Sequence, residues 1–103
     1  MLFRSSDVTL YAIYISTATY NVTYDANNGG GSSVVPVDNT DYSVGQFVTV
    51  WFNVTPSYPG HTFAGWDTDS SAVVPDYVQP PSGTVGFTMP ANDVTLYAVY
   101  TTP

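Results

Sequence analysis

One eight-residue segment occurs twice in this chain, and it constrains the fold more than any other feature. Asp7-Val-Thr-Leu-Tyr-Ala-Ile-Tyr14 recurs 86 residues later as Asp93-Val-Thr-Leu-Tyr-Ala-Val-Tyr100, with seven of eight residues identical. No other segment is duplicated, and self-similarity at a fixed spacing is typical of tandem structural repeats. We therefore predict that residues 1–18 carry the C-terminal strand of a preceding repeat and that residues 19–103 form one complete repeat.

The two repeats are expected to be closely coupled. No linker rich in Gly, Pro and Ser separates them, because Ile15-Ser-Thr-Ala-Thr-Tyr20 joins one β-prone run directly to the next. Thr101-Thr-Pro103 occupies the same place after the second copy and would lead into a further unit or a stalk.

The composition favours strands over helices. Aromatic residues make up 16% of the chain, nine of them tyrosines, whereas lysine, glutamate and cysteine are absent. Aromatic and β-branched residues suit strands, and the best helix formers are almost missing. We predict a mostly β, small α+β fold with five to six short strands and at most one short helical turn.

Charge and cysteine content exclude several classes of function. The net charge is −7 and the only basic residue is Arg4, so the chain repels nucleic acid and anionic membrane surfaces. Without cysteine it can form neither a disulfide scaffold nor a thiolate metal site. Without lysine it cannot supply the amine of an isopeptide cross-link. Stability must therefore come from packing and backbone hydrogen bonds.

Hydrophobic alternation and turn residues predict a succession of short strands and loops. The pattern of residues 47–54 is the strongest, because Val48, Val50, Phe52 and Val54 share one face. We expect one short helical turn in residues 38–45, with an Asp or Asn cap and Gly45 beyond its end. The remaining predicted strands are residues 8–15, 20–24, 34–35, 61–66, 85–89 and 94–100, and the predicted loops are residues 25–33, 56–60 and 67–81.

Two tryptophans raise the question of a binding site. Trp66 follows Gly65 and could stack on a sugar, but a Gly-Trp pair more often packs in a core. Trp51 lies on the other face of its strand from Val48 and Val50, so its side chain is expected to be exposed. Trp51 and Tyr58 are therefore the candidate binding surface, and packing between repeats is the alternative. The predicted core consists of Val48, Val50, Phe52, Phe63, Gly65, Trp66, Phe87, Met89 and Leu96.

Catalytic and metal chemistry find little support. His61 is the only histidine, so neither a catalytic triad nor a zinc site can be assembled around it without other ligands. Asp67 and Asp69 offer oxygen ligands that would suit calcium, although paired aspartates are also common in turns. We therefore predict a non-enzymatic chain without a cofactor, and leave calcium at Asp67 and Asp69 open.

Three stretches together resemble one family. Val22-Thr-Tyr-Asp-Ala-Asn-Asn-Gly-Gly30, Pro59-Gly-His-Thr-Phe-Ala-Gly-Trp66 and Thr88-Met-Pro-Ala-Asn-Asp-Val-Thr-Leu-Tyr-Ala98 are similar to the Listeria-Bacteroides repeat, the B-repeat of internalin-type surface proteins. The resemblance covers about residues 20–100. It implies a small β-grasp-like module, found in tandem in microbial surface proteins, with no catalytic residues. The family usually has Tyr at the position of His61 and Trp at the position of Tyr100. The proline-rich loop 75–81 is a further departure from the family pattern.

These observations predict a spacer or stalk repeat of an extracellular, cell-surface or cell-wall-attached protein. Its expected partners are neighbouring repeats of the same protein. Because residues 7–14 duplicate residues 93–100, we also expect strand exchange or edge pairing between copies, giving a homo-oligomer. The alternative function is a binding module that recognises a host glycan or protein through exposed aromatic side chains.

Overall fold

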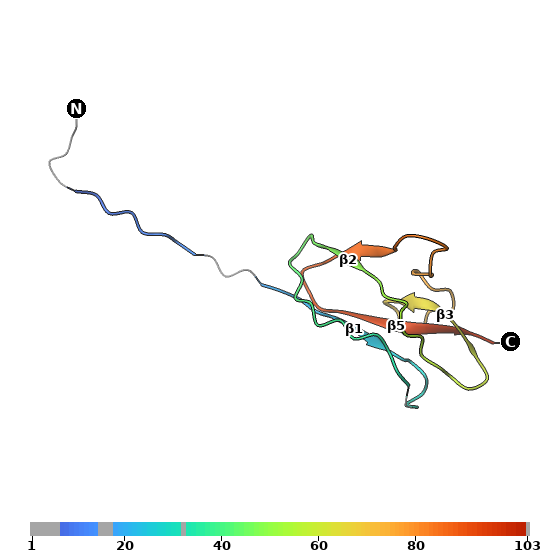
Figure 1. Cartoon of the computed structure of the whole chain (residues 1–103). Helices are drawn as coiled ribbons and strands as arrows, with labels where there is room; N and C mark the ends of the chain where they lie inside the picture. Colours follow the sequence, from blue (N-terminus) through green and yellow to red (C-terminus); the bar gives the residue numbers. More distant parts are fainter. Residues whose placement is uncertain (1–6, 15–17, 32, 103) are drawn as a thin grey trace.

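The computed structural model describes residues 7–14, 18–31 and 33–102, and within them five strands form two small sheets (Figure 1). The first sheet has the order β1-β5-β3, and the second pairs β2 with β4. The strands are β1 (Val22–Asp25), β2 (Phe47–Thr49), β3 (Thr62–Asp67), β4 (Gly86–Thr88) and β5 (Val94–Thr101). No helix occurs in the described ranges, so the predicted small, mostly β fold is confirmed.

The longest strand, β5, lies at the centre of the three-stranded sheet. It pairs in parallel with β1, from Val22 opposite Val94 to Asp25 opposite Tyr97. On its other edge it pairs antiparallel with β3, with an irregularity between Phe63 and Gly65. Because both edges of β5 are occupied, the central position of the sheet is filled within the unit itself.

The parallel pairing places the two ends of the unit far apart. β1 and β5 start side by side, so the chain enters where β5 begins and leaves where β5 ends. Figure 1 shows this arrangement, with the N-terminal segment and the C-terminus at opposite ends of the molecule. The opposite placement of entry and exit follows from the parallel register and does not depend on the loops.

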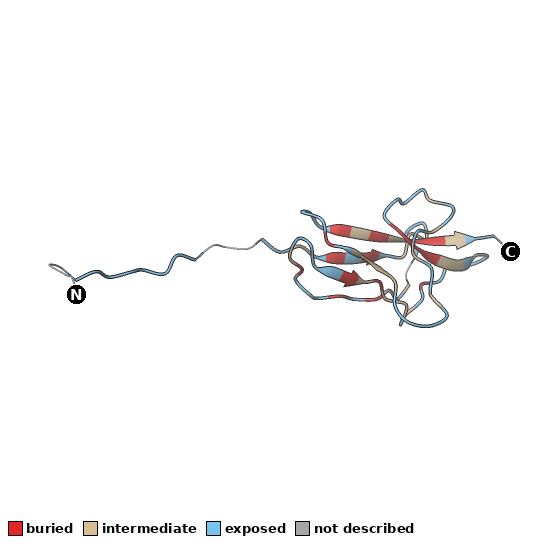
Figure 2. Ribbon diagram, turned by 90° about the horizontal axis from the view of Figure 1, so that it is seen from above, coloured by how far each residue is buried: buried red, intermediate tan, exposed pale blue. Residues whose placement is uncertain are grey.

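The core lies between the two sheets, where the buried faces of all the strands except β4 meet (Figure 2). Alternation buries every second side chain along β1 and from Val94 to Ala98 of β5, as expected for strands with one face inside, and Val99 is buried as well. The largest completely buried side chains are Trp66, Met89, Leu96 and Val48. Val50 and Gly65 of the predicted core set are also buried, whereas Phe52, Phe63 and Phe87 are half-buried and pack against the cluster.

Three segments differ from the expectations of the sequence. Residues 38–45 form no helical turn, because Tyr42 makes two backbone hydrogen bonds with Tyr20 and the chain then turns at Gly45. Residues 34–35 form no strand. The strand predicted at residues 47–54 ends at Thr49, although one further backbone hydrogen bond joins Val50 to Val85.

The duplicated segment is not part of a sheet in this chain. Residues 7–14 are extended and exposed, with Leu10, Ile13 and Tyr14 each 89% accessible. The strand prediction fails here because the position that this sequence occupies in the unit is already taken by β5. Residues 1–6, 15–17, 32 and 103 lie outside the described structure, and with them Arg4, half of the predicted junction 15–20 and the predicted end of strand 8–15.

Candidate functional site

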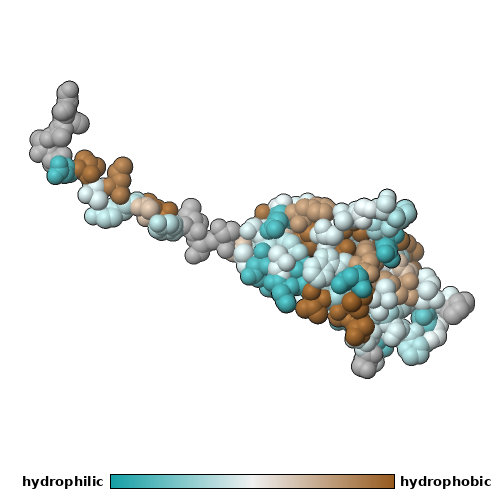
Figure 3. All heavy atoms as spheres, viewed as in Figure 1, coloured by the Kyte–Doolittle hydropathy of each residue, from teal (hydrophilic) through white to brown (hydrophobic). Residues whose placement is uncertain are grey.

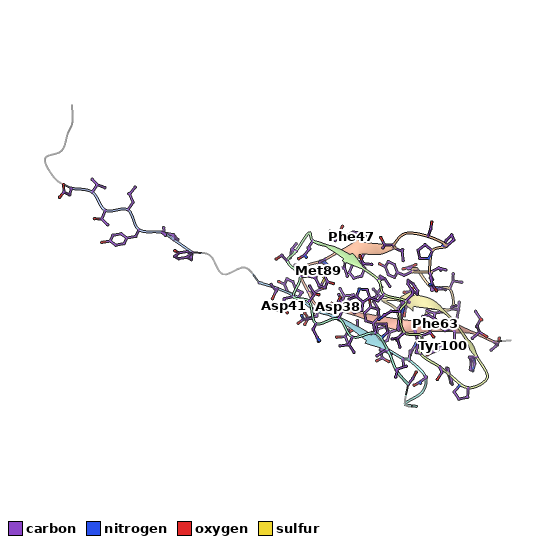
Figure 4. All side chains as sticks on the ribbon, viewed as in Figure 1. Asp38, Asp41, Phe47, Phe63, Met89 and Tyr100 are labelled. Atoms are coloured by element: carbon purple, nitrogen blue, oxygen red, sulfur yellow. The ribbon has the colours of Figure 1, made fainter. Side chains whose placement is uncertain are left out.

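A continuous row of aromatic rings links the core to the surface. The Trp66 ring lies 4.9 Å from that of Tyr24 and 5.1 Å from that of Phe63, in edge-to-face arrangements that aromatic pairs favour. Phe63 continues the row to Tyr100, which lies beside it in Figure 4. The row thus connects Trp66 and Phe63, both in the predicted core, to Tyr100.

The outer end of this row contains Tyr58. Its ring lies 5.3 Å from that of Tyr100 and 4.3 Å from that of His61. The Tyr100 hydroxyl donates a hydrogen bond of 2.6 Å to the carbonyl of Ala26, which ties this end of the row to the loop after β1. Tyr58 is half-buried, so much of its surface is used in packing within the unit.

Trp51 sits in a segment that is fixed through its backbone. Its amide donates to the Tyr24 hydroxyl at 2.9 Å, and its carbonyl accepts from Nε1 of Trp66 at 3.1 Å. The Trp51 side chain is half-buried and packs against the core, so it is less exposed than the strand pattern indicates. The two bonds involve only backbone atoms of Trp51, which leaves its side chain free to be replaced.

Two open grooves meet beside these aromatic residues. One, of about 540 Å³, is lined by residues 49–53 together with Gln79, Pro80 and Gly83. The other, of about 580 Å³, is lined by residues 55–63 and again by Gln79. Trp51 and Tyr58, the two candidate binding residues, therefore lie on adjacent grooves that share one amide side chain. Neither groove is lined by an aspartate or an arginine.

The aspartates considered for calcium are engaged in loop contacts. Asp67 is buried; its Oδ1 accepts from the Asp69 amide at 2.9 Å and its Oδ2 from the Asp76 amide at 2.9 Å. The Asp69 carboxylate in turn accepts from the Ser71 amide at 2.8 Å. These contacts fix the loop after β3, which is the turn chemistry expected of such aspartates. Across the described part of the chain, no cluster of three or more His, Cys, Asp or Glu residues could hold a metal ion.

Three polar residues that the sequence analysis did not include among its candidate site residues hold the connections in place. Asn27 adopts a positive φ of 49° and donates through Nδ2 to the carbonyls of Ser70 and Ala98, at 3.0 Å each. Asp93 accepts from the Asn21 amide at 2.9 Å, which joins the starts of β1 and β5. Asp38 is buried and accepts from the Thr40 amide and the Tyr42 hydroxyl (Figure 4).

A sequence signal was available for two of these connections. Asn and Asp tolerate left-handed backbone and bond to amides two residues ahead, so Asp38-Asn-Thr40 and Asp25-Ala-Asn27 read as Asx turns. An Asp or Asn cap was expected for a helical turn in residues 38–45; Asp38 instead makes an Asx turn with the Thr40 amide, and no helical turn follows. The loop after β1, predicted from the sequence at residues 25–33, is held in place by the side-chain amides of Asn27 and Asn28.

Replacing Asn27 with alanine is expected to destabilise the unit by about 2 kcal/mol. The change removes two hydrogen bonds to carbonyls and leaves alanine in the left-handed region. Asn28→Ala is the matched control, because Asn28 makes a single such bond, to the Ser57 carbonyl at 3.0 Å, and has no positive φ. Urea unfolding of both variants measures the difference, and equal losses would contradict the role given to Asn27.

Burial of tyrosines predicts a loss of stability at alkaline pH. Burial raises the pKa of Tyr24 to about 12, and it also raises the pKa values of Tyr42, Tyr77 and Tyr100. The unfolded chain releases these protons near pH 10, before the folded chain does, so this contribution is complete below pH 10 and declines between about pH 10 and 12. Urea midpoints at stepped pH should fall over that window. Tyr24→Phe should make the decline shallower, and an unchanged slope would count against the assignment.

Five of the residues that make these contacts, Tyr24, Asn27, Phe63, Trp66 and Asp93, fall in the three motif stretches, and the family comparison covers the same region. A family model, the Listeria-Bacteroides repeat domain, matches residues 20–99. The chain belongs to the Listeria-Bacteroides repeat family. The resemblance noted in the sequence is thereby confirmed, and the matched range contains β1 to β4 and most of β5. No curated protein and no solved structure matches the chain.

Membership in the Listeria-Bacteroides repeat family makes this a repeat module of a kind typical of surface proteins and generally non-catalytic. The family motifs have structural roles here: Asn27 fixes a loop, Trp66 fills the core, and Asp93 joins the starts of β1 and β5. The two aromatic departures from the family, His61 and Tyr100, both lie in the aromatic row, where their rings pack against each other with centroids 6.5 Å apart. No helix in the described residues is long and apolar enough to cross a membrane.

Proposed function

We propose that this Listeria-Bacteroides repeat is a non-catalytic spacer of an extracellular cell-surface protein, where it extends a stalk that projects an adhesive region. The observation that carries the proposal is the parallel pairing of β1 and β5, because it separates the entry and exit of the chain. A unit built in this way lengthens a tandem array with every copy, whereas a unit with adjacent termini would fold the array back.

The short connection supports a stiff array. In a following copy, β1 would begin only a few residues after β5 ends, with the sequence of residues 15–21 between them. The entry is held at Tyr20, whose amide and carbonyl bond to Tyr42 at 2.8 and 2.9 Å. With its entry fixed and little free chain between units, each repeat restricts the orientation of the next.

Small-angle X-ray scattering tests the spacer. A chain with two copies of residues 19–103 should be monodisperse, with a maximum dimension close to twice that of one copy. Insertion of a Gly/Ser linker between the copies is the control, because a flexible connection broadens the distance distribution. If the two chains give the same broad distribution, the repeats are freely hinged and the stalk proposal fails.

We propose further that residues 7–14 pair with another copy of the chain by strand exchange. Val8, Leu10, Ala12 and Ile13 correspond to the buried β5 residues Val94, Leu96, Ala98 and Val99. In this chain they are exposed, and Figure 3 shows hydrophobic side chains along the extended segment. In a tandem array the same residues would complete the preceding repeat.

Light scattering at several concentrations tests the exchange. The full chain should associate, and a chain that begins at Ala18 should stay monomeric, because all five strands lie after that residue. Leu10→Asp in the full chain is the matched variant, because it keeps the length but places a charge where β5 has the buried Leu96. Monomers for all three chains across the range would overturn the exchange and leave the spacer proposal intact.

A second candidate function is recognition of a host glycan or protein. The observation that favours it is the pair of uncharged grooves beside Trp51 and Tyr58, which join at Gln79. Trp51→Ala should abolish binding on glycan or matrix-protein arrays with only a partial loss of stability. Phe87→Ala, a half-buried aromatic residue that does not line the grooves, controls for lost packing. Absence of any ligand for the parent chain rejects this function.

A further inference from the structure

We propose that the β1–β5 pair is a mechanical clamp that lets the unit bear tension along the chain. The proposal rests on the spacer function, since a stalk between a cell and an anchored target is stretched end to end. The spacer proposal concerns the length of an array of repeats. The clamp concerns a separate property, the force that is needed to unfold one repeat.

The clamp begins where the chain enters. Tyr20 is bonded to Tyr42 through both its amide and its carbonyl, and Asn21 is held by Asp93 at 2.9 Å and, through Nδ2, by Asp41 at 2.8 Å. The Val94 amide donates to the Asn21 carbonyl at 3.0 Å, and four residue pairs in register follow. Asp41 and its neighbour Asp38 lie at this end of the molecule in Figure 4.

The direction of the strands determines how this ladder is loaded. Tension pulls β1 towards its N-terminal end and β5 towards its C-terminal end. Because the two strands are parallel and adjacent, these forces are antiparallel to each other and lie along the strands. The evenly spaced bonds of a parallel pair are then sheared together. Peeling the strands apart from one end would instead break the bonds one after another.

The second edge of β5 reinforces the exit. β3 pairs with β5 as far as Thr62 opposite Thr101, the last residue of the strand. Trp66 and Leu96, both completely buried, pack the two strands into the core and keep water from the ladder. The β2–β4 pair, by contrast, forms the other sheet, and neither of its strands is the one at which the chain enters or leaves the unit. The load path therefore runs through one sheet only.

The absence of cysteine from the sequence allows force to be applied at chosen residues. In single-molecule pulling, handles on Ala18→Cys and Thr102→Cys of the full chain shear the clamp. Handles on Ala18→Cys and Asn92→Cys lie at the same end of β1 and β5 and peel them apart. All three positions are exposed. The shear geometry should require a several-fold higher unfolding force at the same pulling speed, and equal forces in both geometries would overturn the clamp.

A pair of matched variants separates mechanical from thermodynamic stability. Asp93→Ala removes the bond to the Asn21 amide within the clamp, and Gln46→Ala removes an equivalent exposed bond to the Ser43 amide outside it. In the shear geometry, Asp93→Ala should lower the force and Gln46→Ala should not, even where urea unfolding gives similar losses. Forces that simply follow the urea stabilities would reject the clamp. An extended array in scattering with equal pulling forces would refute the clamp alone, whereas a freely hinged array would refute the spacer.

Discussion

Trp66→Ala is expected to cause the largest loss of stability of any single change in this unit. The side chain is completely buried, and its ring contacts those of Tyr24 and Phe63. Removing a buried tryptophan typically costs about 3–5 kcal/mol, and the Trp51 carbonyl would also lose its donor. A small domain has only about 5–15 kcal/mol to lose, so most of the stability should disappear.

Urea unfolding followed by circular dichroism measures this loss. Trp51→Ala is the matched control, because it makes the same chemical change at a half-buried position and keeps both backbone hydrogen bonds of residue 51. The control should lose much less than Trp66→Ala. Similar losses at the two positions would mean that Trp66 is not the centre of the core.

The sequence predicted the fold well where periodicity and composition act together. Alternation at residues 20–24 and 94–100 located the two strands that pair in parallel, and the buried side chains Val48, Val50 and Leu96 follow the predicted pattern. Alternation identifies strands because such strands bury one face. A unit with few helix formers is also not expected to contain helices, so strands and loops were the only elements to assign.

The differences arise where tertiary contacts decide. Val34 and Val35 have strand-forming side chains but form no ladder, and residues 7–14 have the sequence of β5 but no vacant position beside β1 and β3. The same side chains form a strand only where neighbouring strands offer partners. Likewise Trp51 follows the predicted alternation, yet it packs partly against the core, because the strand ends at Thr49 and the chain leaves the sheet.

The exposure of the candidate aromatic residues was the hardest feature to predict from the sequence, because an aromatic side chain on a strand or loop can pack against its neighbours. Tyr58 was selected for its exposure, and it lies at the outer end of the aromatic row against Tyr100 and His61. Asn27 and Asp93 hold two loops against the sheet, but their side chains are polar and therefore do not contribute to a hydrophobic periodicity. Their partners are more than 40 residues away in sequence, beyond the reach of local patterns.

Gly65→Ala is also expected to destabilise the unit strongly, by about 2–4 kcal/mol. A Cβ at this position would lie 2.3 Å from the Tyr77 carbonyl oxygen and 2.8 Å from Cβ of Pro75. The Tyr77 backbone cannot move away without breaking its two hydrogen bonds to Trp66, at 2.9 and 3.0 Å. The long loop after β3 is therefore held against the sheet by the lack of a side chain at residue 65.

Gly31→Ala is the control for this prediction, because the nearest atom to its added Cβ is Nδ2 of Asn28 at 3.5 Å, an ordinary contact, and its φ is not positive. The control should unfold at nearly the same urea concentration as the parent chain. In Gly65→Ala, amide hydrogen exchange should also increase at Trp66 and Tyr77, whose amides are bonded across this contact. A stable Gly65→Ala variant with unchanged exchange at both amides would show that the loop does not pack on residue 65.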